Sequence, residues 1–246
     1  KLSLTVSWSP FAQPFTFFSS FSFSFSFSFS SFPLHLLLFL LFLCTQNGDG
    51  NTALHYGAYQ RHTEIVKSLL ANLTPEQQLP FLITQNRDGD TALHNAACKG
   101  HTDTVKSLLV ILTPEQQLQL LFTQDFTGDT ALDSAARNRH TETVKTLLDR
   151  LTPQQQLQLL SVQNGYGNTT LHKAAQWGHT ETVKNLLDII TPEQQLKLLS
   201  VKNKEGKTAS QEAVGYNGTS YIMRTLEHYQ KEAYYRVKFR KFAKFS

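Results

Sequence analysis

Charged residues are missing from the first fifth of the chain, since no Asp, Glu, Lys or Arg occurs between Leu2 and Gly48. Cysteine and methionine are scarce throughout, with two Cys and one Met among 246 residues. The two thiols, Cys44 and Cys98, are too few for a disulfide framework or a cysteine-based metal site. We therefore expect a reducing compartment, the cytoplasm, for this protein.

Basic residues are also unevenly placed. The net charge is +4, yet the last sixteen residues carry six Lys and Arg against Glu232, which leaves −1 for the rest of the chain. The isoelectric point of about 9.0 thus describes a C-terminal tail rather than a basic domain.

The chain contains a long internal repeat. The motif TALH, or a close variant of it, begins at Thr52, Thr91, Thr130, Thr169 and Thr208, always 39 residues apart. A second motif, LTPEQQL, recurs in the same phase, with its Thr at positions 74, 113, 152 and 191. Two motifs in one phase predict a repeat array over residues 47–228, with units starting near 47, 86, 125, 164 and 203.

Each unit is predicted to contain a turn and three helices. The turn is rich in Asn, Asp and Gly, and the first helix is short and made of small residues, as in Ala92–Ala97. The second helix has one apolar stripe, which in the first unit comprises Ile65, Val66, Leu69, Leu70 and Leu73. In the third, Thr74 caps the helix, Pro75 takes the first position and Gln77 completes a capping box. The expected fold is an all-α solenoid of stacked helix-turn-helix repeats, with an extra short helix per repeat.

The unit G-N-T-A-L-H-Y-G-A-Y-Q-R-H-T-E-I-V-K-S-L-L resembles the ankyrin repeat, whose pattern is G-x-T-P-L-H-x-A-A-x-x-G-H-x-x-V-V-x-x-L-L. The resemblance covers about residues 47–228. It implies an ankyrin-like solenoid that binds another protein. The unit departs from the usual length of about 33 residues by the TPEQQL insertion, and Ala, or Thr170, replaces the Pro of the pattern. The fifth unit loses the TPEQ segment, as a terminal cap would.

The residues that could suggest catalysis are explained by the repeat. Seven of the nine histidines keep the repeat phase: His55, His94, His172, His62, His101, His140 and His179. The resemblance implies that they tie neighbouring units together by side-chain to backbone hydrogen bonds. Gly206-Lys207-Thr208 mimics a phosphate-binding loop but lacks the required Gly at Val201. No nucleophile is paired with a uniquely placed base, so we expect no enzyme, no cofactor and no metal.

Positions that vary between units are free for recognition. They are the turn tips and the exposed side of the first helix, which line the concave face of ankyrin-like arrays. Large aromatics at such positions are typical interface anchors. The predicted partner-binding residues are Tyr59, Gln60, Arg87, Asp88, Lys99, Phe126, Arg137, Asn138, Tyr166, Gln176, Trp177, Lys204 and Tyr216. The predicted function is a monomeric scaffold or adaptor for a partner protein.

Residues 1–46 form a low-complexity segment rich in Phe, Ser and Leu, which has three interpretations. A signal or membrane anchor would be built on residues 34–44, but the apolar run is about half of what a spanning helix needs, and its charged flank is poor. A disordered leader is the second. Because these residues share pyrimidine-rich codons, we favour the third, translated intron sequence before a splice acceptor. The alternatives to a free scaffold are therefore a membrane-tethered ankyrin protein and a fragment of a longer one.

Cations and aromatics alternate in the tail, residues 229–246. On a helix, Arg236, Arg240 and Lys244 form one stripe beside Tyr235, Phe239 and Phe242. The interpretation that we favour is a terminal helix whose aromatics cover the last repeat and whose charges keep it soluble. An anionic membrane surface or a nucleic-acid backbone is the alternative, and only the tail offers a site for either.

Overall fold

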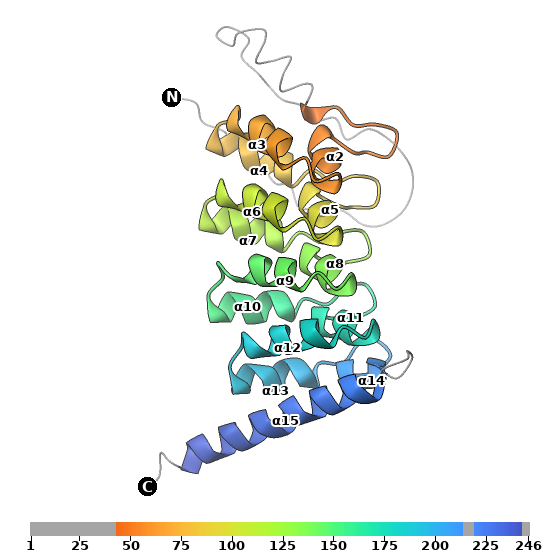
Figure 1. Ribbon diagram of the computed structural model, residues 1–246, viewed down its shortest axis with the longest axis vertical. Coiled ribbons are helices and arrows are strands. Elements are labelled where there is room, and N and C mark those ends of the chain that lie inside the picture. Colours follow the sequence, from red (N-terminus) through yellow and green to blue (C-terminus); the bar gives the residue numbers. More distant parts are fainter. Residues whose placement is uncertain (1–42, 214–218, 243–246) are drawn as a thin grey trace, which may run out of the picture.

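The computed structural model describes residues 43–213 and 219–242. Within these ranges the chain is a stack of helical repeats (Figure 1). The only β-type pairing there is an isolated bridge between Gln124 and Thr130. The predicted all-α solenoid is confirmed. Residues 1–42 and Tyr216 lie outside the described residues.

Helices occur in threes along the array (Figure 1). The first helices are α2 (Ala53–Tyr59), α5 (Ala92–Cys98), α8 (Ala131–Arg137), α11 (Thr170–Gln176) and α14 (Ala209–Glu212). The second helices are α3 (Thr63–Ala71), α6 (Thr102–Val110), α9 (Thr141–Leu148) and α12 (Thr180–Asp188). The third helices are α4 (Pro75–Leu82), α7 (Pro114–Leu121), α10 (Pro153–Leu160) and α13 (Pro192–Ser200), and α15 (Thr219–Phe242) ends the stack. Figure 1 places the turns and first helices along one side, and the second and third helices along the other.

The first helices stack because their side chains are small. In α5, Ala92, Ala96 and Ala97 are buried, and their size lets α2 and α8 approach closely on either side. The helix begins at a capping box in which Thr91 Oγ1 accepts from the backbone N–H of His94. Capping of this kind satisfies N–H groups that have no partner within the helix.

The second helices bury the predicted stripe with one exception. Val66, Leu70 and Leu73 are buried, but Ile65 is 54% exposed, so its expected burial was wrong. In the second unit the same position is Thr104, which is buried against the preceding repeat and lies 2.7 Å from Thr63 Oγ1. Ile65 lacks such cover because the structure describes no repeat before the first.

The TPEQQL helix begins as predicted. Thr113 N donates to Gln116 Oε1 at 3.0 Å, and Thr113 Oγ1 accepts from Gln116 N at 3.3 Å. The next glutamine has a role that the sequence did not reveal. Gln117 Nε2 donates to the carbonyls of Leu109 (2.8 Å) and Leu112 (3.0 Å) at the end of α6, where the last carbonyls lack the regular helical partner. The Leu109 oxygen also accepts from Leu112 N at 3.2 Å. The added helix therefore caps the helix before it.

Histidines connect the units, as predicted. His55 Nε2 lies 2.9 Å from the carbonyl oxygen of Asp90 in the next turn. His101 Nε2 lies 3.0 Å from the carbonyl oxygen of Tyr59, at the end of the preceding first helix. One column thus bonds forward and the other backward. The first two interfaces between units receive both bonds, the third receives that of His179 and the fourth that of His172.

The last unit ends in a long helix. Helix α15 packs on α12, α13 and α14 through Ile222, Leu226 and Ala233, which are buried. The predicted boundary between array and tail at residue 228 lies within this helix. Tyr235 and Phe239 are 43% and 66% exposed, so the expectation that they cover the last repeat was wrong. No helix of the described ranges is both long and apolar enough to cross a membrane.

Candidate functional site

The turns form a continuous row along the stack. Asn86 Oδ1 accepts from the N–H groups of Asp88 and Asp90, both at 2.9 Å, and folds the second turn. Gly89 has a φ of 83° and its α-carbon faces the backbone of Phe126 so closely that a β-carbon would collide with it. Phe126 N donates to Asp88 O at 3.1 Å, and the other tips are joined in the same way. We call the five turns with the five first helices the turn face.

The tip residues predicted to bind a partner all project from this row. Arg87, Asp88 and Lys204 are exposed, and Phe126 and Tyr166 are 71% and 66% exposed. Such exposure is unusual for large aromatics. The framework of the turns is made by Asn or Asp side chains, Gly and backbone groups, so the two rings are not needed to build it.

A second set of predicted residues lies at the ends of the first helices. Tyr59 and Trp177 are 42% and 45% exposed, Gln60, Lys99 and Asn138 are exposed, and Arg137 and Gln176 are half-buried. Lys99 Nζ stands 4.3 Å from the centre of the Tyr59 ring, a cation–π contact between adjacent units. Gln176 Nε2 donates to Glu212 Oε1 at 3.3 Å, so it is partly occupied within the array.

Sequence reasoning missed two arginines beside this set. Arg61 and Arg139 adopt φ of 63°, whereas the second and fourth units have Gly100 and Gly178 at the same position. A left-handed backbone costs a non-glycine residue about 1–2 kcal/mol. The sequence contains a signal for these arginines: the ends of the first four first helices carry basic but no acidic residues, and they read Y-Q-R, C-K-G, R-N-R and Q-W-G. We call Arg61, Lys99, Arg137 and Arg139 the basic rim.

Polar side chains fill the junctions behind the turn face. In three of the four junctions the turn asparagine donates to the side chain that precedes the Thr of the previous unit: Asn86 to Asn51 (2.9 Å), Asn164 to Asp129 (2.7 Å) and Asn203 to Asn168 (2.9 Å). Between the second and third units, the corresponding residues are Asp125 and Asp90. Burial, and then the charges of Asp125 and Asp88, raise the pKa of Asp90 to about 6.

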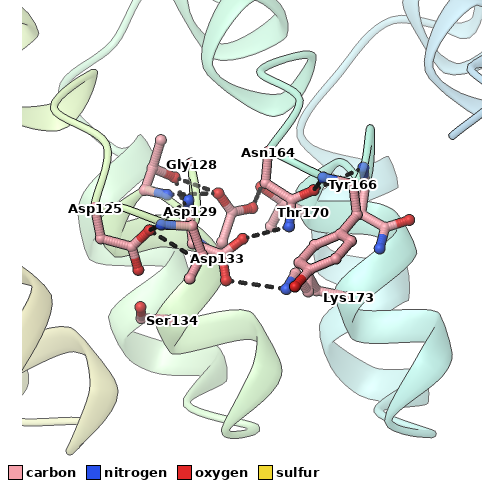
Figure 2. Close-up of polar contacts among 12 residues, drawn as sticks. Asp125, Gly128, Asp129, Asp133, Ser134, Asn164, Tyr166, Thr170 and Lys173 are labelled. Carbon is pink, nitrogen blue, oxygen red and sulfur yellow. Dashed lines mark hydrogen bonds and ion pairs between the residues drawn. The ribbon is translucent and has the colours of Figure 1, made fainter. Parts of the chain in front are cut away.

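The junction between the third and fourth units contains a buried ion pair (Figure 2). Lys173 Nζ lies 2.9 Å from Asp129 Oδ2, and their side chains are 11% and 3% exposed. Nearby, Asp133 stands in the histidine column and accepts from Thr170 Oγ1 at 2.6 Å. Thr170 itself stands where other units have Ala, so the two departures from the repeat pattern meet in one hydrogen bond.

The pKa shifts in these junctions have structural causes. Burial raises the pKa of Asp133 to about 6, although hydrogen bonds from Thr170 and Thr130 act in the opposite direction and lower it. Burial likewise lowers the pKa of His94. Raised carboxyl pKa values also occur in active sites, but Asp133 is 1% exposed and is enclosed by its own repeats. In the described ranges no three His, Cys, Asp or Glu side chains gather as metal ligands would.

Comparison with known families agrees with the geometry. The family model described as "Ankyrin repeats (3 copies)" matches residues 75–158, and the one described as "Ankyrin repeats (many copies)" matches residues 29–70 and 132–187. No curated protein sequence matches the chain. From residue 47 on, the matched segments lie within the first four units, those with complete motifs.

Proposed function

The chain belongs to the ankyrin repeat family, and we propose that it is a scaffold that binds a partner protein through the turn face. Ankyrin repeats are in general protein–protein interaction modules, and stacked repeats offer extended surfaces for this purpose. The observation that carries the proposal is the exposure of the large aromatic residues Phe126, Tyr166 and Trp177 on this face.

The aromatic residues supply the apolar part of the binding surface. Interface hot spots are enriched in Trp, Tyr and Arg, and all three types occur on the turn face. Tyr166 extends from a tip and Trp177 from the end of α11 in the same unit. A partner that contacts both would span the fourth unit from its turn to its first helix.

The basic rim supplies the charge. Arg61 and Arg139 keep a strained φ of 63° where sister units have glycine, and such strain is concentrated at functional sites. The ends of α2, α5, α8 and α11 include cations but no anions. A partner segment with acidic residues opposite the rim and apolar residues opposite Tyr166 would complement this face.

Site-specific crosslinking tests the proposal. A photoreactive amino acid at Tyr166 should capture a partner in cells, whereas the same group at Lys106, exposed on α6, should not. With the captured protein purified, we expect Tyr166→Ala with Trp177→Ala to weaken binding at least tenfold, since hot-spot truncations cost about 2 kcal/mol or more. The thermal unfolding midpoint should hardly change.

Two exposed apolar residues outside the turn face provide the matched control. Val110 and Tyr234 are 56% and 52% exposed, and Val110→Ala with Tyr234→Ala should leave the affinity unchanged. Crosslinking only from position 106 would show that the face is wrongly assigned. Unfolding of the Tyr166→Ala, Trp177→Ala variant would show that these residues belong to the core.

A further inference from the structure

The outward face of α15 carries a straight line of aromatic and basic residues. They are Tyr221, Arg224, His228, Lys231, Tyr235 and Lys238, and all of them are exposed. Their spacing alternates between three and four residues, which places them along one side of a helix. At 1.5 Å per residue the line is about 26 Å long. We call it the outer stripe.

The opposite face of α15 holds the helix on the array. Ile222, Leu226 and Ala233 are buried, and Tyr229 Oη donates to Asp188 Oδ1 of α12 at 2.6 Å. Figure 1 shows α15 running obliquely across the end of the stack, with no described helix beyond it. An extended surface can therefore approach the stripe from the side away from the array. At the N-terminal end of the stripe, Lys184 Nζ of α12 lies 5.8 Å from the centre of the Tyr221 ring.

Aromatic side chains widen the stripe near its C-terminal end. Tyr234 and Phe239 are 52% and 66% exposed, and their ring centres lie 5.9 and 6.4 Å from that of Tyr235. The acidic Glu232 beside them is 3.8 Å from Arg236. The result is a cluster of three exposed rings within residues 234–239.

We propose that the outer stripe binds an anionic membrane surface. Lys and Arg are attracted to anionic headgroups, and Tyr favours the membrane–water interface, so both residue types of the stripe contribute. A nucleic acid is the less suitable partner. Duplex DNA presents one charge per about 1.7 Å, or roughly 15 charges along the stripe, against the three cations Arg224, Lys231 and Lys238.

This membrane contact would be independent of the turn face. Because α15 closes the end of the stack, the membrane would lie against the last repeat and the array would extend away from it. The turns lie along the side of the stack (Figure 1), where a partner protein retains access. The protein would then hold its partner at a membrane surface.

Vesicle co-sedimentation of the full chain tests this inference. We expect binding to phosphatidylcholine vesicles that contain about 30 mol% phosphatidylserine, and much weaker binding to phosphatidylcholine alone or in about 0.5 M salt. Arg224→Gln, Lys231→Gln and Lys238→Gln together should lower the partition coefficient at least tenfold, since each cation contributes roughly fivefold. Tyr235→Trp should show blue-shifted emission on the anionic vesicles.

The matched control removes the same charges elsewhere. Lys106→Gln, Arg150→Gln and Lys202→Gln replace exposed residues outside α15 and should leave binding nearly unchanged. Equal loss in this control would mean that net charge alone acts. If the protein binds neutral vesicles and the triple Gln variant of α15 binds them equally well, the membrane contact lies outside α15. If it binds duplex RNA but no vesicles, the stripe is a nucleic-acid site. Each of these three results would overturn the proposal.

Discussion

Replacing Asp125 by Asn should stabilise the array by repairing the one junction without an asparagine. Asp125 Oδ1 accepts from the N–H groups of Thr127 (2.8 Å) and Asp129 (2.9 Å), and an Asn Oδ1 would preserve both bonds. The new Nδ2 group would face Asp90, as Asn164 Nδ2 faces Asp129 in the next junction at 2.7 Å. The substitution exchanges a repulsion between carboxylates for a hydrogen bond to one of them.

The pKa of Asp90 bounds the size of the effect. It is about 6 in the folded protein against about 3.9 in an unfolded chain, and each pKa unit corresponds to 1.36 kcal/mol, so the ionised side chain costs at most about 3 kcal/mol. Burial is the largest cause of the shift, and that part remains in the variant. The lost repulsion and the gained charged hydrogen bond should together raise the free energy of unfolding by about 2 kcal/mol.

The gain should depend on pH. A carboxyl whose pKa is higher in the folded state destabilises that state when ionised. The cost is therefore absent below about pH 4, grows between pH 4 and 6, and is complete above about pH 6. Buried histidines such as His94, whose pKa is lowered, make the folded state less stable below about pH 6.5. The quantity to compare is thus the difference between variant and wild type at each pH.

Urea denaturation at pH 7.5 and at pH 4.5 measures this difference. Asp88→Asn is the matched control, because Asp88 is exposed and its replacement removes the same charge near Asp90 without adding a hydrogen bond. We expect the control to gain less than about 0.5 kcal/mol. A variant Asp125→Asn that is no more stable than wild type at pH 7.5, or whose gain is the same at both pH values, would refute the reasoning.

Three further substitutions test other contacts by thermal and chemical denaturation. Lys173→Met leaves Asp129 buried without its cation (2.9 Å) and should cost about 3 kcal/mol; an effect below about 1 kcal/mol would show that the pair is solvated. Thr170→Ala removes the 2.6 Å bond to Asp133 and should cost about 1–3 kcal/mol, whereas the same change combined with Asp133→His, which copies other units, should cost less. Gly89→Ala, at a φ of 83° and against the next turn, should lose more than about 1 kcal/mol, while an unchanged midpoint would contradict the close stacking of the turns.

The repeat architecture was readable from the sequence because its determinants are local. The capping box of Thr113 and Gln116 lies within four residues, and so does the turn built by Asn86. The apolar stripes follow helical periodicity, which Val66 and Leu70 obey. The periodic histidines could be assigned to the framework because a column that recurs in several units cannot be a unique site.

The predictions that failed concerned what covers a surface. Ile65 has the hydrophobicity of a core residue but faces outward at the first unit. Tyr235 and Phe239 were expected to cover the last repeat. Instead, Ile222 and Leu226 face the array, and because the two rings lie on another side of α15 they are exposed to solvent. Hydrophobic pattern alone does not say which face of a helix meets a neighbour when both faces are partly apolar.

The sequence by itself determined the period, the three helices of each unit and the columns that vary, since these depend on contacts between residues near in the chain. Only the tertiary structure decided which columns of adjacent units meet. The stacking offset brings Asp90 towards Asp125, pairs Lys173 with Asp129, and joins Asp133 to Thr170, at separations of 35 to 44 residues that the 39-residue step does not specify. Burial in these junctions then sets the charges, because a carboxylate enclosed between two units needs a donor or cation that its own unit does not provide.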